Sequence, residues 1–239
     1  MNITNNNNFI IFPIQDDYII EIWDVESKVL AYKIDDLDSV DQITINTSPD
    51  SKYLFFTSDQ NEISQMDILQ HRVVAKYVGT HKGSITTLSV TPDATRLFSA
   101  GMEGELCFYQ VPTIKKGDPV HEIKHYGELP EIDDNYWMGI NMQGEEGNSK
   151  CVIQSLANDV YVIDIIQCKV ISEVHIPMSI QGVCDIAITL DNSRMFLTGS
   201  DNTNIVEIDI AKMSEKSNDS LHPSIKSHSS NHSGGAPWG

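Results

Sequence analysis

The sequence predicts an all-β fold built from repeated units, and three observations support this prediction. Short apolar runs alternate with turn residues, and no amphipathic helical pattern of useful length competes with them. A strand that ends in a large residue followed by Asp or Gln recurs five times, with the large residue at positions 23, 66, 109, 163 and 208. Turns that contain Asp50, Asp93 and Asp191 precede three of these positions by 16, 16 and 17 residues, so the units keep phase.

The length of the repeat predicts the architecture. Successive intervals of 43, 43, 54 and 45 residues accommodate four short strands each, which is typical of the blade of a β-propeller. We therefore expect a β-propeller of about five four-stranded blades over residues 9–213. A polar N-terminal segment, 1–8, and a disordered Ser- and His-rich tail, 214–239, would flank it.

The individual strands follow from the apolar runs in chain order. The first unit supplies three strands after Phe9, because "MNITNNNN" is too polar and short to form a fourth. The second unit contains four runs, "DQITIN", "YLFFTS", "EISQMDI" and "RVVAKYV". The third and fourth units also have four strands, and an enlarged loop within 112–137 follows a strand at about 120–126. The fifth unit ends after three strands, since nothing resembling a strand follows Ile210.

Charge and composition exclude several classes of partner. The chain has 34 acidic residues against 16 Lys and Arg, a net charge of −18 and a pI near 4.6. Such acidity disfavours nucleic acid or an anionic membrane as the partner. The four cysteines show no metal-binding spacing. No basic region precedes the short apolar stretch at 9–14, and no apolar run reaches about 18 residues, so we expect neither a leader nor a membrane span. We therefore expect a cytoplasmic protein, with nuclear or cytoskeletal association left open.

Polar residues at defined spacing occur in "THKGSITTLSVTPDATRLFSAGMEGELCFYQV", which runs from Thr80 to Val111. They are His81, Ser99, Glu103 and Tyr109. In the first unit, Asp17 and Trp23 occupy the last two places of the set, and Trp-Asp ends the strand "IIEIWD". This pattern resembles the WD40 repeat over about residues 9–210. The fourth and fifth units, such as "VYVIDIIQCKVISEVHI", are equally similar to the related YVTN propeller repeat.

The resemblance implies a structural role for these residues. In WD40 blades a His before the first strand, a Ser or Thr in the second, an Asp in the next turn and a Trp in the third form a hydrogen-bonded network. The equivalent network here would contain His81, Ser99, Glu103 and Tyr109, with Glu and Tyr replacing Asp and Trp. Typical WD40 rings have seven blades and need about 300 residues at this period. Three architectures therefore stay open: a tight five-bladed ring, a truncated product, or an open propeller that a partner chain completes.

The resemblance also implies a function. WD40 propellers generally serve as non-catalytic scaffolds that bind protein partners within larger complexes. The alternative is a YVTN- or lactonase-like enzyme with a site in the central channel. In that case "SITTLSV" and "DIAITL" would be innermost strands that face the channel.

Few residues suggest catalysis or metal binding. His81 and Ser99 could act as base and nucleophile, but their places in the repeat favour a structural role. The other histidine candidates do not form the pattern of a specific metal site. They are His121, His125, His222, His228 and His232. No Gly-rich phosphate loop and no HExxH motif occurs, so we expect no catalytic residue, cofactor or metal.

An acidic loop is the best candidate for a contact surface. The run "ELPEIDD" from Glu128 is followed by Tyr136 and Trp137, and negative charge beside aromatic residues suits basic protein segments. The alternative is a solvated loop whose Trp137 begins the next core strand. We expect one blade-end face to bind the partner. Its candidate contacts are Asp16, Asp59, Glu128 and Trp137.

Overall fold

The structure is a computed structural model of the 239-residue chain. It describes residues 1–35, 37, 42–59, 62–78, 81–128, 137–141, 150–155, 159–175, 183–189, 193–199, 204–209 and 226–229. Every regular element in these ranges is a β-strand, as the all-β prediction requires. None of the described residues belongs to a helix long and apolar enough to cross a membrane.

The strands form five sheets, which we number as blades one to five in chain order. Blade one contains β1 (Asn2–Ile3), β2 (Phe9–Ile14), β3 (Ile19–Asp24) and β4 (Leu30–Ile34). Blade two contains β5 (Ile45–Thr47), β6 (Tyr53–Asp59), β7 (Glu62–Asp67), β8 (Arg72–Tyr77) and, at its outer edge, β12 (His121–Ile123). Blade three contains β9 (Ile85–Val90), β10 (Arg96–Gly101), β11 (Leu106–Gln110) and β13 (Gly127–Glu128).

The last two blades repeat the same order of four antiparallel strands. Blade four contains β14 (Trp137–Asn141), β15 (Lys150–Ser155), β16 (Asp159–Asp164) and β17 (Lys169–His175). Blade five contains β18 (Val183–Ile188), β19 (Arg194–Gly199), β20 (Asn204–Asp209) and β21 (Lys226–Ser229). The predicted number of blades and the predicted unit of four strands are therefore confirmed.

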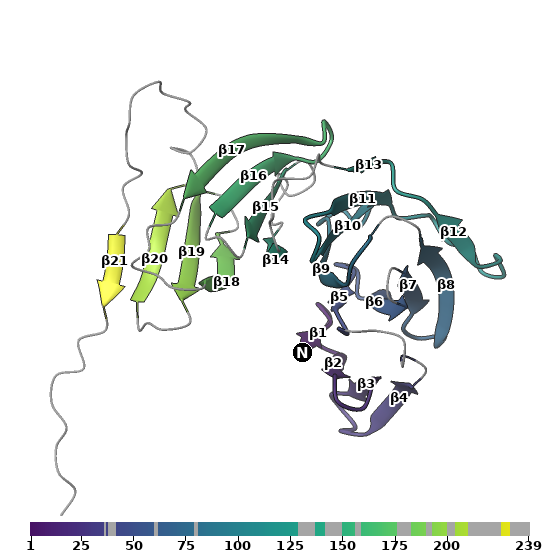
Figure 1. Ribbon diagram of the computed structural model, residues 1–239. Helices are drawn as coiled ribbons and strands as arrows, with labels where there is room; N and C mark the ends of the chain where they lie inside the picture. The colour runs from purple at the N-terminus through teal and green to yellow at the C-terminus, as the bar shows by residue number, and fades with distance from the viewer. Residues whose placement is uncertain are drawn as a thin grey trace, which may run out of the picture.

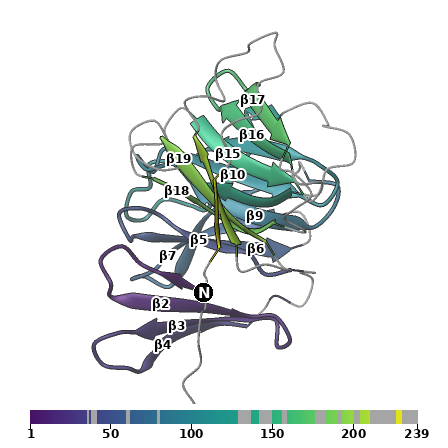
Figure 2. The same ribbon diagram turned by 90° about the vertical axis from the view of Figure 1, so that its left-hand side faces the viewer.

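The blades lie side by side around a common centre, with the first strand of each blade innermost (Figure 1). The innermost strands β1, β5, β9, β14 and β18 contact one another in that order. No comparable contact joins β18 back to β1 within the described ranges, so the arc is open between blades five and one. In the view turned by 90°, blade one forms one end of the arc, below β5 to β7 (Figure 2).

Apolar side chains between consecutive blades hold the arc together. Because successive residues of a strand point to opposite faces, each blade uses one face for the preceding blade and the other for the following blade. Ile11, Ile22 and Leu37 from the first unit pack with Leu54 and Met66 of blade two. The next two interfaces are rich in aromatic residues. Their members include Phe55, Tyr77 and Tyr109 between blades two and three, and Phe98, Phe108 and Tyr161 between blades three and four.

One turn between the first two strands recurs in four blades. The hydroxyl oxygens of Thr4, Ser48, Thr91 and Thr189 each accept a hydrogen bond from the backbone N–H five residues later, at 3.0, 2.9, 3.0 and 3.1 Å. In the first three blades the same hydroxyl donates to an Asn or Asp side chain two residues later. The next residue then has a positive φ of 58°, 62° or 57°. This turn explains why the Pro-Asp signals keep phase with the strands.

A second repeated turn explains the Asp that closes the third strand. The Oδ1 atoms of Asp24, Asp67 and Asp164 accept hydrogen bonds from the backbone N–H three residues later, at 2.7, 2.9 and 2.8 Å. The residue that follows adopts a left-handed conformation, with φ of 59° at Lys28, 49° at His71 and 50° at Cys168. The Asp of the repeat therefore stabilises the turn into the fourth strand.

The two ends of the chain differ from the prediction. Residues 2–3 form β1, which pairs with β2, because Thr4 and Asn6 build the same turn as in the other blades. The segment 1–8 is therefore part of blade one. At the other end, β21 pairs with β20, so the expected disorder of 214–239 is wrong for residues 226–229. The other residues of that segment lie outside the described ranges.

The strand expected at about 120–126 is divided between two blades. The first part, β12, pairs parallel with β8 of blade two, whereas β13 pairs antiparallel with β11 of blade three. The guanidinium of Arg72 donates to the carbonyl of Asp118 at 3.1 Å, and the N–H of Val78 donates to the carbonyl of Ile123 at 3.1 Å. The enlarged loop thus ties the outer edges of blades two and three. Residues 129–136 of this loop lie outside the described ranges.

Thr91→Val tests the first repeated turn. Thr91 is fully buried, and the substitution keeps its size while removing the acceptor for the Arg96 N–H and the donor to Asp93. We expect the free energy of unfolding in urea to fall by about 1–3 kcal/mol, because the partly buried N–H of Arg96 and the carboxylate of Asp93 both lose their partner. Thr113→Val, at an exposed position, is the control and should change it by less than about 0.5 kcal/mol. Equal losses in both variants would contradict the role of the turn.

Candidate functional site

A buried polar network joins the loop before blade three to the second strand of that blade. Nε2 of His81 lies 2.5 Å from Oγ of Ser99. Nδ1 of His81 lies 3.8 Å from Oε2 of Glu105, and Oε1 of Glu105 accepts the backbone N–H of Lys82 at 2.8 Å. All three side chains are buried, and Ser99 is 0% exposed. The network therefore fixes the loop to the sheet.

The structure places Glu105, and not Glu103, beside His81. Glu103 is exposed in the turn after β10, where its side chain lies over Gly83. Gly104 has a φ of 80°, a left-handed conformation that turns the chain back into the sheet, so Glu105 is the first side chain to point inward. The assignment of Glu103 from the repeat pattern is corrected to Glu105. A Glu at the position after the turn Gly was the signal in the sequence.

The environment of Glu105 keeps its carboxylate ionised. Burial raises the pKa of this carboxyl. Hydrogen bonds from His81 and from the backbone N–H groups of Lys82 and Glu105 lower the pKa by more, so it lies below the ordinary 4.5. Gly101 leaves the space that the pair needs. A Cβ at this position would lie 2.7 Å from Oε2 of Glu105 and 2.8 Å from Nδ1 of His81.

Tyr109 packs against the preceding blade. It is 1% exposed and meets Tyr77 edge-to-face, with ring centroids 5.3 Å apart and an interplanar angle of 76°. The residues that share its place in blades two, four and five are also buried. They are Met66, Ile163 and Ile208.

Ser99, His81 and Glu105 have the order of nucleophile, base and acid found in hydrolytic triads. The complete burial of Ser99 leaves its Oγ without a path for a substrate. Its partner His81 is 4% exposed. The arrangement therefore favours stabilisation of the blade over acyl transfer.

The first unit does not assemble the equivalent network. Asp17 is exposed in the turn between β2 and β3. Trp23 lies on β3, and its indole Nε1 donates to Oε2 of Glu21 at 2.8 Å. The structure thus brings Trp23 to Glu21 and leaves Asp17 at the surface.

The four candidate contacts lie at one end of the blades. Asp16 lies in the turn after β2, the second strand of blade one. Asp59 ends β6, the second strand of blade two, and Glu128 ends β13, the fourth strand of blade three. Trp137 begins a first strand. In a sheet of four antiparallel strands, these places all belong to the same end. The topology therefore brings the acidic candidates and Trp137 to one blade-end face.

The remaining histidines do not form a metal site in the described part of the chain, where no three metal-binding side chains gather. His121 instead lies 3.6 Å from Oδ2 of Asp118, at the start of β12. His125 follows this strand, and His228 belongs to β21. His222 and His232 lie outside the described ranges.

Comparison with known proteins identifies the fold. No protein-family model and no curated protein matches the sequence. Among solved structures, the β-propeller domain of Cps50 (Swd1) from Myceliophteria thermophila superposes with a TM-score of 0.71. The match covers 95% of this chain and 70% of that chain, at 14% sequence identity. The chain has a β-propeller fold.

Within the described ranges, one face of blade one has no neighbouring blade. Cross-strand pairing places Ile3, Ile10, Trp23 and Leu30 in one row across all four strands of this face. Their neighbours Ile11 and Ile22 point the other way, into the core with blade two. Ile3 is 44% exposed and Leu30 is 38% exposed, while Ile10 and Trp23 are half-buried. This row was not predicted from the sequence, because β1 was not predicted.

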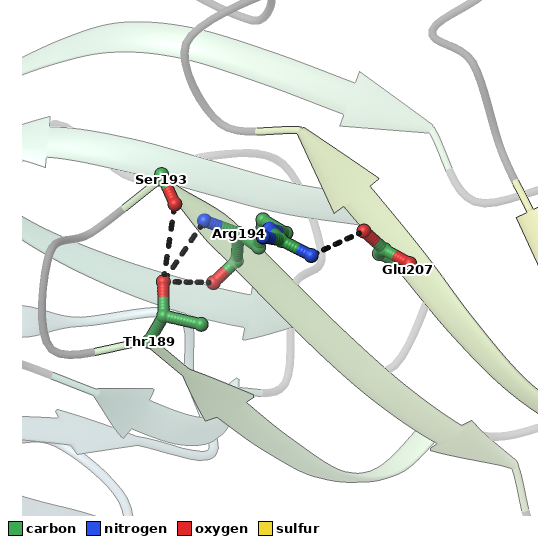
Figure 3. Close-up of polar contacts among 4 residues, drawn as sticks. All are labelled: Thr189, Ser193, Arg194 and Glu207. Carbon is green, nitrogen blue, oxygen red and sulfur yellow. Dashed lines mark hydrogen bonds and ion pairs between the residues drawn. The ribbon is translucent and has the colours of Figure 1, made fainter.

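The open face at the other end of the propeller carries an ion pair beside apolar side chains, among them Ile205, which is 44% exposed. In blade five, Met195 and Ile208 are buried, whereas Phe196 and Glu207 form a half-buried pair on the opposite face. Nη1 of Arg194 lies 3.4 Å from Oε1 of Glu207. Figure 3 shows this ion pair beside the turn in which Thr189 bonds the backbone of Arg194. The two ends of the propeller therefore present different chemistry.

Ser99→Ala separates a structural role from a catalytic one. Removing the hydroxyl leaves Nε2 of His81 buried without its partner. We expect the free energy of unfolding in urea to fall by about 1–3 kcal/mol. Ser27→Ala, in the exposed turn after β3, is the control for loss of a surface hydroxyl. Unchanged stability of Ser99→Ala would contradict a structural network.

Glu105→Gln tests the electrostatics of the same network. Because the folded-state pKa of Glu105 lies below its unfolded value near 4.5, the carboxylate contributes stability above that pH, and this is lost as the pH falls through the folded-state pKa. We expect the wild type to be more stable than Glu105→Gln near neutral pH, with the difference shrinking below pH 4.5. Urea unfolding across a pH series measures this. Glu103→Gln controls for removing a charge from the same turn, and a pH-independent difference for Glu105→Gln would refute the coupling.

Proposed function

We propose that the propeller is a non-catalytic, WD40-like scaffold that binds protein partners within a larger cytoplasmic complex. The observation that carries this proposal is the open arc. Among the described residues, the end blades each have one sheet face with no packed neighbouring blade, and in blade one this face carries the row that consecutive blades bury against each other. Exposed faces of this kind mark interaction sites. One partner completes the ring at these faces.

The charge of the chain supports a protein partner over a polyanion. A net charge of −18 repels phosphate backbones and anionic lipids. The blade-end face that holds Asp16, Asp59, Glu128 and Trp137 supplies a second contact, for a basic segment of a partner. We propose these four residues as its contacts.

Purification of a tagged full chain from its own cells tests the scaffold role. Mass spectrometry with intensity-based quantification should find one or two proteins at near-equal molar ratio to the chain, persisting through size-exclusion chromatography. The partner should be lost in high salt only if the acidic blade-end face dominates binding. A chain that returns alone and monomeric under gentle conditions would overturn the scaffold proposal.

Neutralising the acidic blade-end face tests the contact residues separately. The variant Asp16→Asn/Asp59→Asn/Glu128→Gln should slow association with the co-purified partner by about tenfold at low salt and reduce its salt dependence. Surface plasmon resonance at several ionic strengths measures both effects. Glu26→Gln/Glu122→Gln removes two exposed charges from elsewhere and is the control. Equal association rates for all three proteins would rule out this face while leaving the scaffold role intact.

A further inference from the structure

We propose that the partner completing the ring docks a β-sheet of blade type on the open face of blade one, over the row Ile3, Ile10, Trp23 and Leu30. The inference rests on the proposed scaffold function and adds the surface and the chemistry of the partner. The row crosses the whole blade, because Ile3 pairs with Ile10, Ile10 with Trp23 and Trp23 with Leu30. It therefore presents a continuous apolar strip to the gap in the arc.

The same row forms the blade interface elsewhere in this propeller. In blade two, Leu54 pairs with Met66 and Met66 pairs with Val73, and these residues pack against blade one. Leu54 and Met66 are 0% and 2% exposed, whereas Ile10 and Trp23 at the same places in blade one are half-buried. The open face of blade one thus carries the same row of side chains that blade two packs against its preceding blade.

Blade three shows the same correspondence. Val90 pairs with Leu97, and Leu97 pairs with Tyr109. All three lie in the apolar core shared with blade two. Tyr109 holds the repeat position that Trp23 holds in blade one. Since a preceding sheet covers this row in blades two and three, a sheet is the occupant that fits it in blade one.

Glu21 adds a polar requirement to the apolar row. It lies next to the row, pairs across the strands with Phe12 and Lys33, and accepts the indole N–H of Trp23. A docked sheet would desolvate this carboxylate, which is costly unless a partner group compensates it. The partner sheet therefore carries an Arg or Lys opposite Glu21, set among aliphatic side chains.

A second copy of the chain fits the gap poorly. Its blade five would place the Arg194–Glu207 ion pair against the apolar row. The gap is also too small, because the chain already covers 70% of the length of the propeller domain on which it superposes. Another arc of the same length would overlap the first before the ring closed. The occupant is therefore a different and smaller sheet.

Site-specific photo-crosslinking in the full chain tests the docking surface. A benzophenone amino acid replaces Ile3, which is 44% exposed, and in the control it replaces Leu69, which is 75% exposed in a turn of blade two. Position 3 should cross-link to one protein, at a peptide with alternating apolar residues and a nearby Arg or Lys. The control should not label that peptide. No cross-link above the control, or cross-links to a second copy of this chain, would overturn the proposal.

Charged substitutions then test the energetics with the purified partner found by cross-linking. Ile3→Glu and Trp23→Glu should each weaken binding about 100-fold in calorimetric titration, because they bury an uncompensated carboxylate. Leu69→Glu should bind within about twofold of the wild type. Thermal unfolding of each free variant shows whether its fold is intact, and Ile3→Glu, at the most exposed place in the row, keeps the test valid if Trp23→Glu unfolds. A stoichiometric partner that binds Ile3→Glu normally would refute this docking surface but not the scaffold function.

Discussion

The packing of one sheet face against the next is the interaction on which the whole structure depends. Each blade is a small four-stranded sheet, and such a sheet cannot bury an apolar face by itself. Its stability comes from rows such as Leu54, Met66 and Val73, which pack on the preceding blade. Phe55 and Tyr77 on the other face of blade two pack on the following one. Among the described residues, one face of blade one and one face of blade five therefore lie without a packed neighbouring blade.

Turn chemistry, more than the polar network, keeps the blades in register. The Thr or Ser turn and the Asp turn recur in most blades, with the same hydrogen bonds and the same left-handed residue. By contrast, a network like that of His81, Ser99 and Glu105 occurs only in blade three within the described ranges. Met66, Ile163 and Ile208 hold the repeat position of Tyr109 by apolar burial. The fold thus tolerates loss of the network in other blades because packing supplies the same constraint.

The sequence predicts the repeating parts of this structure and misses the parts that break the repeat. Strands β6 to β8 match three predicted runs, since alternation and turn residues agree there, and β5 overlaps only the end of the predicted run at 41–46. β1 was missed because two residues carry no alternation, although Thr4, Asn6 and Phe9 follow the pattern of Thr91, Asp93 and Arg96. The division into β12 and β13 depends on pairing with a distant strand, which no local pattern reveals. Glu105 lies beside His81 in place of the expected Glu103, because the left-handed conformation of Gly104 changes the direction of the chain between them.

The proposed docking surface links the stability of blade one to the binding of its partner. In architectures of repeated units, each unit is stabilised by its neighbours, so an end blade with one neighbour is the least stable. Blade one has only a two-residue innermost strand, and that strand is held by the turn at Thr4 and by contacts of β1 with β5. A sheet that docks on Ile3 binds the folded blade and not the unfolded one, which stabilises the blade by mass action. In the proposed complex, folding of the end blade and docking of the partner sheet are then one coupled equilibrium.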